Sequence, residues 1–325
     1  MASQTPKVSV IMPVLNEEGH LEDAVKSVLA QNFEGELLLA LGPSSDKTDE
    51  IAERLAKHDK RIRLVPNPRG LTTVGMNLAI KVSRHEFIVR VDAHSEPREN
   101  YIARGVEILE ETKADLVGGI MAARGKTLFQ KAVAWAYTSP FGLGSASYHV
   151  GGQAGEAESA YLGIFRKSAL ERVGGYDESI IRGEDWELAQ RIKTTGGLVW
   201  FSPELQVTYW PRSSWQALVK QFYSTGVWRG DLTRRSPKTA SWRYFIPPTL
   251  VLSLVLGNLL ASLGLAIGWA PFLAYFWAVV FVGFYSKLAP VPLVLATMHI
   301  SWGVGFLVGF FKGAAGTIDR SRVTK

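Results

Sequence analysis

From Phe245 to Phe311 the chain carries a single formally charged side chain, Lys287. A surface in water cannot be built from so uniformly apolar a stretch, whereas the interior of a bilayer requires one. Segments near 246–267, 269–285 and 289–311 each have roughly the 17 to 25 residues that a membrane-crossing helix needs. We therefore expect a membrane region of about three helices over residues 245–312.

Basic residues flank this apolar stretch on both sides. Before it stand Arg229, Arg234, Arg235, Lys238 and Arg243, and after it stand Lys312, Arg320, Arg322 and Lys325. Cytoplasmic flanks of membrane helices are enriched in Lys and Arg, so both basic flanks are expected in the cytosol. An odd number of crossings would place the two flanks on opposite sides of the membrane. We expect three crossings; the open alternative is that the short middle segment, which holds Pro271, is re-entrant or interfacial.

The charge distribution indicates which partners to expect. The net charge is +6, and five of the 36 Lys and Arg residues but only one of the 30 Asp and Glu residues follow Arg243. This favours an anionic membrane surface and gives little support to nucleic-acid binding. The absence of cysteine excludes disulfides, thiolate zinc sites and thiol nucleophiles. Met1–Lys7 is short and polar, unlike a signal peptide, so the part before the apolar stretch is expected in the cytosol.

Strands and helices alternate at the start of the chain. We expect strands over 7–14, 36–41, 61–66 and 86–91, a helix through 21–29, one ending at Leu55 and one near 73–82. This alternation predicts an α/β fold with a parallel sheet flanked by helices. Ligands of such folds bind beyond the carboxyl ends of the strands, so the loops after Val14, Leu41, Pro66 and Val91 should converge on one crevice.

The strand that ends near Val91 is followed by two side chains that can bind a metal. On an extended backbone residues i and i+2 point the same way, so Asp92 and His94 could face one divalent ion bound to a diphosphate. The alternative is a strand-end Asp that caps a turn beside a surface His. Further along, Thr127–Tyr148 is rich in aromatic residues, which fits a membrane-surface or lid segment as well as an ordinary core helix.

Several ordered motifs carry a family resemblance. They are Ser9–Glu18 (SVIMPVLNEE), Arg90–His94 (RVDAH) with Ser95-Glu96-Pro97, Tyr161–Arg166 (YLGIFR), Val173–Glu178 (VGGYDE) and Gly183–Leu188 (GEDWEL) with Arg191. Together they resemble the family 2 glycosyltransferases of GT-A (Rossmann-like) fold, in the succinoglycan β-glucosyltransferase-like subgroup whose Asp-x-Asp region ends in His. The resemblance covers about Lys7 to Arg235 and is specific because the blocks occur in the family's order.

The resemblance implies roles for particular residues. Asp185 would be the general base, with Glu184 as its partner in the family's Glu-Asp pair. Pro13, Asn16 and Glu17 would line the base and ribose pocket with Asp46 nearby, and Asp92 would bind metal and diphosphate. Gln221 and Arg229 fall in a downstream segment that closes over donor phosphates, although Arg229 also fits a basic juxtamembrane face. Glu184 and Asp185 also fit an acidic pair at a helix N-terminus.

Two departures from the family pattern affect selectivity. Many members of the family have an acidic pair before this loop, but in this chain Leu41–Asp46 supplies only the last carboxylate, Asp46. The identity of the nucleotide base is therefore left open. His94 replaces an oxygen ligand by nitrogen, which favours Mn²⁺ over Mg²⁺ if His94 touches the metal; alternatively it contacts the donor. Arg69 lies in a loop that flanks the sugar-phosphate and is a second phosphate candidate.

The domains expected are a GT-A catalytic domain over 1–211, an amphipathic interfacial segment over 212–244, the membrane region over 245–312 and a basic tail over 313–325. The resemblance implies an inverting hexosyltransferase of cell-envelope polysaccharide biosynthesis. It would move a hexose from a nucleotide-sugar, with UDP-sugars favoured, to a hydroxyl of a polyprenyl-linked or other lipid-linked glycan. The cofactor would be Mn²⁺ or Mg²⁺.

The expected location is the cytoplasmic (inner) membrane of a bacterial-type cell, with several crossings and the catalytic domain in the cytosol. The expected partners are the donor, the lipid-linked acceptor and membrane lipids, with a homo-oligomer left open. Two rival functions remain at this point: a polyprenyl-phosphate glycosyltransferase, which needs no strong base, and a non-catalytic nucleotide-sugar-binding membrane scaffold.

Overall fold

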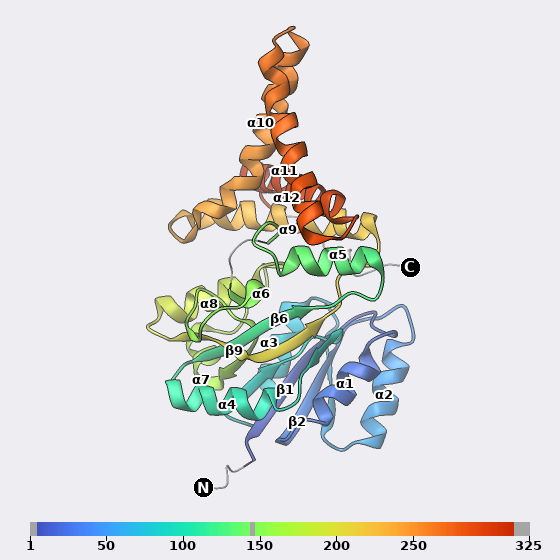
Figure 1. Ribbon diagram of the computed structural model, residues 1–325. Coiled ribbons are helices and arrows are strands. Elements are labelled where there is room, and N and C mark those ends of the chain that lie inside the picture. Colours follow the sequence, from blue (N-terminus) through green and yellow to red (C-terminus); the bar gives the residue numbers. More distant parts are fainter. Residues whose placement is uncertain (1–4, 144–146, 315–325) are drawn as a thin grey trace. The chain divides into compact units, whose positions relative to one another are not determined.

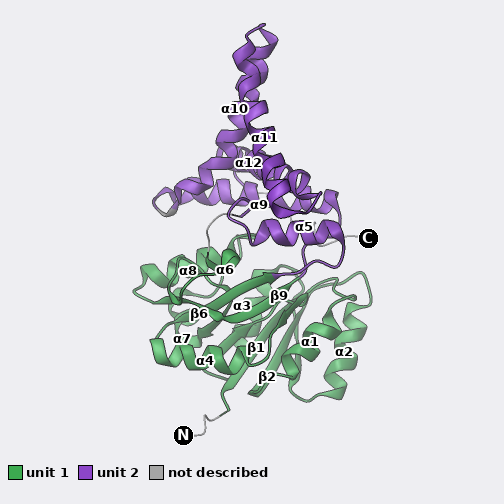
Figure 2. Ribbon diagram, viewed as in Figure 1, with its two compact units in different colours: residues 1–122, 146–209 green, residues 123–145, 210–325 purple. Residues whose placement is uncertain are grey.

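The computed structural model describes residues 5–143 and 147–314, so most of the expected basic tail lies outside the described residues. The chain divides into two compact units (Figure 2). Unit 1 comprises residues 1–122 and 146–209, and unit 2 comprises residues 123–145 and 210–325. Residues 123–145, which the sequence-based division assigned to the catalytic domain, thus cluster with the C-terminal helices.

Unit 1 is built on a mixed sheet (Figure 1). Its strands are β1 (Lys7–Val14), β2 (Glu34–Leu41), β3 (Ile62–Pro66), β4 (Phe87–Arg90), β5 (Ser95–Pro97), β6 (Leu116–Ala123), β7 (Gly155–Glu156), β8 (Tyr161–Arg166) and β9 (Val199–Tyr209). Its helices are α1 (Leu21–Leu29), α2 (Thr48–His58), α3 (Thr72–Val82), α4 (Tyr101–Thr112), α6 (Ser147–Val150), α7 (Lys167–Val173) and α8 (Glu184–Thr194). Within the described residues the strand order is β3-β2-β1-β4-β8-β6-β9-β5, with β7 beside β9.

The expectation of a parallel sheet is correct for only part of this sheet. β1, β2, β3 and β4 are parallel, as the alternating pattern predicts. β8, however, pairs antiparallel with both β4 and β6, and β5 pairs antiparallel with β9. Strand direction depends on pairing between segments far apart in the chain, and the short apolar runs of these later strands do not encode it.

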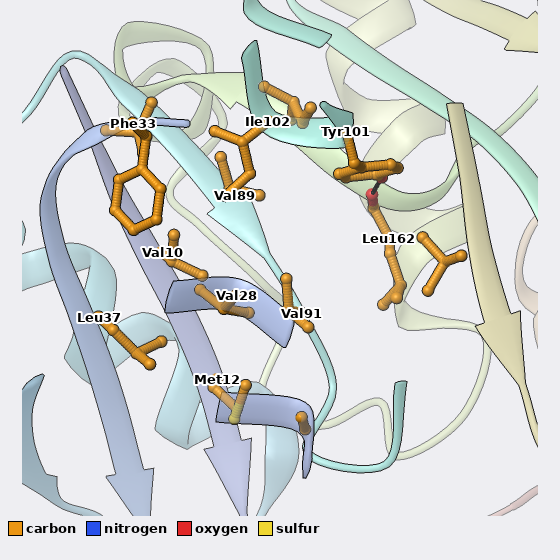
Figure 3. Packing of buried hydrophobic residues seen from close by; sticks show 14 of the residues in the cluster. Val10, Met12, Val28, Phe33, Leu37, Val89, Val91, Tyr101, Ile102 and Leu162 are labelled. Atoms are coloured by element: carbon orange, nitrogen blue, oxygen red, sulfur yellow. Dashed lines mark hydrogen bonds between the residues drawn. The ribbon is translucent and has the colours of Figure 1, made fainter. Parts of the chain in front are cut away.

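The core lies on both faces of the sheet because side chains alternate along each strand. Val10, Leu37 and Val89 point to one face, where α1, α2 and α4 cover them; Figure 3 shows Val28 of α1 and Ile102 of α4 among these side chains. Ile11 and its neighbours point to the opposite face, beneath α3, α7 and α8. The parallel strands are therefore buried on both sides, and Ser9 of β1 and Glu36 of β2, which are polar and buried within them, are hydrogen-bonded to each other.

Unit 2 is helical. It contains α5 (Leu128–Tyr137), α9 (Trp215–Arg235), α10 (Ile246–Ser262), α11 (Ala270–Ser286) and α12 (Val291–Lys312), with short 3₁₀ turns η1 (Pro237–Thr239), η2 (Trp242–Phe245) and η3 (Ala266–Trp269). By length and composition, three described helical stretches could cross a membrane: Trp242–Ser262, Ala266–Ser286 and Val291–Lys312. These three candidates match the three apolar segments expected from the sequence.

Local signals set where the helices of unit 2 begin. Thr127 and Gln130 form a reciprocal capping box at the start of α5, and the Ser214 hydroxyl accepts a hydrogen bond from Ala217 N at the start of α9. The buried face of α5 contributes Tyr137, whose ring meets Phe222 of α9 edge to face at 5.9 Å between centroids. Residues 128–137 therefore form a helix that packs within unit 2.

Candidate active site

The guanidinium of Arg90 gathers three carboxylates at the end of β4. Its Nε donates to Asp92 Oδ1 at 3.0 Å, its Nη2 donates to Glu184 Oε1 at 3.1 Å, and its Nη1 donates to Asp185 Oδ1. The Arg90 side chain is 2% exposed, and it lies 5.8 Å from the ring centroid of Tyr176. Asp92 and Asp185, which are 93 positions apart by number, thus contact one cation in unit 1.

Two local features of the chain deliver these carboxylates. β4 ends at Arg90, and the chain then turns, with Ser95 N donating to the Asp92 carbonyl at 2.9 Å. On the other side Gly183 adopts a left-handed φ of 80°, which glycine adopts at little cost, and α8 begins directly after it. Glu184 and Asp185 therefore occupy the first turn of α8, where the helix dipole favours negative charge.

The carboxylates of the cluster keep Arg90 charged. Burial alone would lower the pKa of Arg90, but the charges of Asp185, Asp92 and Glu184 outweigh it and hold that pKa well above its usual range. The guanidinium is therefore always charged, and within the cluster this one positive charge contacts three carboxylates.

His94 joins the neighbouring loop. Its Nδ1 lies 3.0 Å from Glu17 Oε1. In the tautomer in which Nδ1 donates to this carboxylate, Nε2 carries the lone pair that could bind a metal, in the carboxylate–histidine arrangement common at metal sites. The expected alternation of Asp92 and His94 along an extended strand is wrong, because Ala93 and His94 lie in the turn between β4 and β5.

The loops after β1 and β2 are tied together by hydrogen bonds. Asn16, with φ at 54°, accepts from Ser45 N on Oδ1 at 2.7 Å, and Glu17 N donates to Thr48 Oγ1 at 2.7 Å. Asp46 accepts from Glu18 N at 3.3 Å and from Thr48 N at 3.0 Å. Burial raises the pKa of Asp46, but hydrogen bonds from the Thr48 side chain and from the backbone of Thr48 and Glu18 outweigh it and lower that pKa below its usual value. The loops expected to meet after Val14, Leu41 and Val91 are therefore linked in the structure.

The remaining predicted donor contacts lie in different places. Pro13 is in β1, opposite Ala40 of β2. Arg69 is exposed and forms an ion pair with Glu178 at 2.6 Å. Gln221 and Arg229 are in α9 of unit 2, where the Arg229 guanidinium lies 4.6 Å from the ring centroid of Tyr244. The structure thus brings together Asn16, Glu17, Asp46 and His94 in one group and Asp92, Glu184 and Asp185 in another.

Arg90 is the residue that the motifs did not single out. A signal for it was present, since an arginine within a strand that is otherwise buried on both faces needs compensating charges. Which carboxylates supply that compensation could not be predicted, because Glu184 and Asp185 are almost a hundred positions away. The sequence also did not single out Ser44 and Thr48, whose hydroxyls accept hydrogen bonds from Asn16 N and Glu17 N.

With this geometry, comparison with known proteins identifies the class. Residues 9–174, about half of the chain, match the model of the family described as glycosyl transferase family 2. The chain belongs to that family and is a glycosyltransferase with a GT-A-like fold.

Two curated relatives and one solved structure show how far the similarity extends. The chain is 30% identical to the succinoglycan biosynthesis protein ExoA of Rhizobium meliloti, over 91% of this chain and 93% of that protein. It is 24% identical, over 94% and 98%, to the Methanococcus voltae dolichyl N-acetyl-alpha-D-glucosaminyl phosphate 3-beta-D-2,3-diacetamido-2,3-dideoxy-beta-D-glucuronosyltransferase. In structure it resembles the mannosyltransferase PcManGT of Pyrobaculum calidifontis in complex with GDP-Man and Mn²⁺. The TM-score is 0.67 at 18% identity, covering 94% of this chain and 88% of that one.

Proposed function

We propose that the protein is an inverting hexosyltransferase. It moves a hexose from a nucleotide-sugar, preferentially a UDP-sugar, to a hydroxyl of a polyprenyl-linked or other lipid-linked glycan at the cytoplasmic face of the membrane. The observation that carries the proposal is the meeting of Asp92, Glu184 and Asp185 around the buried guanidinium of Arg90. The proposal assigns Asp92 to the diphosphate and Asp185 to proton transfer, and their shared contact with Arg90 supports it.

In the proposed reaction Asp185 is the general base. A sugar hydroxyl is a poor nucleophile near neutral pH, and a carboxylate that accepts its proton in the transition state speeds attack by about 10² to 10⁴-fold. The hydroxyl oxygen bonds to the anomeric carbon while the bond from that carbon to the diphosphate oxygen breaks, so the nucleoside diphosphate leaves with the bonding electrons. Attack opposite the leaving group inverts the anomeric centre. Arg90 and Glu184 hold Asp185 in place through the cluster.

Asp92 and His94 are the proposed protein ligands of a divalent cation. The described residues contain no group of three or more His, Asp or Glu side chains that could hold a metal by themselves. Cations at nucleotide-sugar sites, however, commonly take one or two protein ligands and complete their shell with phosphate oxygens and water. The Mn²⁺ named with the Pyrobaculum mannosyltransferase supports this assignment. When bound, the cation would stabilise the negative charge of the leaving diphosphate.

The loops after β1 and β2 form the proposed nucleotide pocket. Asn16, Glu17 and Asp46 are held in place by their mutual contacts, and Pro13 precedes them at the end of β1. Arg69 would reach phosphate by exchanging its exposed partner Glu178, which costs little because exposed ion pairs contribute only about 0 to 1 kcal/mol. Gln221 and Arg229 of α9 are further proposed donor-binding residues.

A lipid-linked acceptor and a membrane location are supported by the composition of unit 2 and by the relatives. The Methanococcus protein is named for transfer to a dolichyl phosphate-linked sugar, and ExoA is named for the synthesis of a polysaccharide. We propose that residues 1–211 form the catalytic domain in the cytosol, that 212–244 lies at the interface and that 245–312 anchors the protein in a bacterial-type inner membrane. The apolar stretch would place the site close to acceptors that lipid anchors hold in the bilayer.

Transfer from radiolabelled UDP-, GDP- and dTDP-hexoses to membrane lipid extract tests this function. A labelled lipid product that appears with one donor and has an inverted anomeric centre is the expected result. A product with retained configuration would contradict one-step displacement. Transfer to a bare polyprenyl phosphate that survives Asp185→Asn would favour a polyprenyl-phosphate glycosyltransferase, and binding without turnover of any donor would favour a scaffold.

A further inference from the structure

Helices α9 and α12 of unit 2 run side by side in the same direction. Near their starts Trp215 Nε1 donates to Thr297 Oγ1 at 2.9 Å, across 82 positions of sequence. Further along, the backbones of Tyr223 and Val227 face Gly305 and Gly309, at the same offset. At each of these contacts the residue in α12 lies 82 positions after its partner in α9. Because this separation stays the same from the start of α9 onward, the two helices are parallel and in register over most of α9.

Glycines on both helices make this contact close. A side chain at Gly226 or Gly230 of α9 would collide with the backbone of α12, and a side chain at Gly305 or Gly309 would collide with the backbone of α9. Small residues spaced four apart on two facing helices allow the backbones to approach in this way. Because the contact is backbone to backbone, the depth of α12 relative to a membrane is tied to the depth of α9.

The charges of α9 exclude it from the hydrocarbon interior. The helix carries Lys220, Arg229, Asp231, Arg234 and Arg235. Asp231 is fully buried and pairs with both Arg234 and Arg235, but those two arginine side chains are 49% and 43% exposed. Exposed charges of this kind are costly inside a bilayer and favourable at its surface. A helix packed along α9 over such a length is held at the same level.

Helices α10 and α11 are less buried in the protein than α12. Each lies within a 21-residue apolar helical stretch, about 31 Å long and thus able to cross the hydrocarbon core. Only 17% of the most apolar window of each is buried in the protein, against 44% for α12. The ends of α10 and α11 that meet at η3 extend away from α9 and α12 (Figure 2), whereas Pro247 of α10 and Tyr275 of α11 contact α12. Their outward side chains include Val255, Leu256, Leu259, Trp277, Phe281 and Phe284, which are exposed in the protein.

We infer that α10 and α11 cross the bilayer as a hairpin, whereas α12 lies with α9 along the membrane surface. Two crossings return the chain to the side from which it started. The basic flank that ends at Arg243 and the one that starts at Lys312 then face the same leaflet, as the enrichment of Lys and Arg on both flanks favours. The partner of this surface is a bilayer with anionic headgroups, to which each nearby basic side chain is attracted. The inference concerns membrane topology and does not depend on the donor or the chemistry.

Single cysteines test the topology, because the chain has no cysteine of its own. Ser236→Cys follows α9, Ser262→Cys ends α10, Ala289→Cys lies between α11 and α12, and Ser321→Cys lies in the basic tail. Intact spheroplasts that express each variant are treated with a membrane-impermeant maleimide before and after permeabilisation. We expect Ser262→Cys to be labelled in intact spheroplasts, and the other three to be labelled only after permeabilisation.

Each other pattern overturns the inference. Three crossings would expose Ser321→Cys together with Ser262→Cys, and a re-entrant α11 would expose Ala289→Cys together with Ser262→Cys. Labelling of all four positions only after permeabilisation would mean that no segment crosses, for example because a second copy of the chain rather than lipid covers α10 and α11. The cysteine-free parent gives the background, and labelling after denaturation gives the amount of each variant. The same pattern is expected in an Asp185→Asn background, which separates this result from failure of the proposed chemistry.

Discussion

The carboxylate of Asp185 lies against Nη1 of Arg90, a guanidinium that unit 1 buries to 2% exposure. The same guanidinium binds Asp92 through Nε, so the proposed base and the proposed diphosphate-binding carboxylate are held by one cation. Removal of that cation would take from the buried Asp92 and the partly exposed Asp185 the counter-charge that Arg90 supplies, and such a loss is costly in a medium of low dielectric constant. Arg90 thus links the stability of unit 1 to the proposed chemistry.

Arg90→Gln is expected to destabilise the protein strongly. Removing one partner of a buried ion pair typically costs about 3 to 5 kcal/mol, which for a domain of this size lowers the melting temperature by roughly 10 °C. Thermal unfolding of the purified protein in detergent measures this change. Arg104→Gln is the control, because Arg104 also contacts three carboxylates, but at the surface, where a pair contributes about 0 to 1 kcal/mol. Equal effects of the two substitutions would contradict the structural role given to Arg90.

Asp185→Asn is expected to abolish turnover and to preserve donor binding. The amide keeps the shape of the carboxylate but cannot accept the hydroxyl proton, so kcat should fall by about 10² to 10⁴-fold. Transfer rates at saturating donor measure this loss, and calorimetry measures nucleotide affinity. Glu171→Gln, an exposed carboxylate of α7, should leave kcat unchanged. A kcat of Asp185→Asn close to that of the unmodified enzyme would rule out base catalysis by this residue.

Donor binding is expected to need both a divalent cation and Asp92. A ligand that binds only the native state at 100 times its Kd stabilises that state by about 2.7 kcal/mol, which a thermal shift detects. UDP-, GDP- and dTDP-hexoses are compared with and without Mn²⁺, and the largest shift should require the metal. Asp92→Asn should remove the metal-dependent part, whereas Asp23→Asn on the exposed face of α1 should not. A shift of full size in Asp92→Asn would show that Asp92 does not bind the cation.

Asn16 is expected to depend on both its backbone and its side chain. Its φ of 54° is strained for alanine but not for glycine, and its Oδ1 holds the loop after β2 through Ser45 N. Asn16→Ala should therefore raise the donor KM more than Asn16→Gly, with about 1 kcal/mol of additional destabilisation from the left-handed backbone. Donor titrations and melting curves of both variants measure these two effects. Equal KM values for the variants would mean that the backbone conformation of this loop does not affect donor binding.

Glu36 of β2 is expected to give the fold a pH dependence. Burial raises its pKa, but hydrogen bonds from Arg63, from Ser9 Oγ and from Arg84 N outweigh burial and lower the pKa below its ordinary value of 4.5. A depressed pKa in the folded state stabilises the fold above the unfolded-state pKa, and this contribution is lost as the pH falls through the folded-state value.

The measurement is the difference in melting temperature between the unmodified protein and Glu36→Gln, from neutral pH downward. The difference should be largest above pH 4.5 and should shrink below it. The exposed Glu171→Gln should show no such trend. A difference that grows as the pH falls would mean that the pKa of Glu36 is raised in the folded protein, contrary to its contacts.

Much of the architecture could be predicted because it rests on local patterns. The strands over 7–14 and 61–66 and the helix near 73–82 follow from apolar periodicity, which depends on residues a few positions apart. The same holds for the three apolar helices, since length and the absence of charge define them. The ordered motifs predicted the family, and the loops after Val14 and Leu41 do meet.

The sequence by itself thus determined the elements, the apolar C-terminal region and the family of this glycosyltransferase. The tertiary structure decided the rest, because it depends on contacts between distant segments that no local pattern encodes. β8 enters the sheet antiparallel beside β4, Arg90 finds its counter-charges on α8, and α12 packs along α9 through facing glycines. The physical reason is the same in each case. A strand edge, a buried charge or a glycine-lined helix face can pair with many segments of suitable chemistry. The tertiary fold decides which of these segments lies next to it.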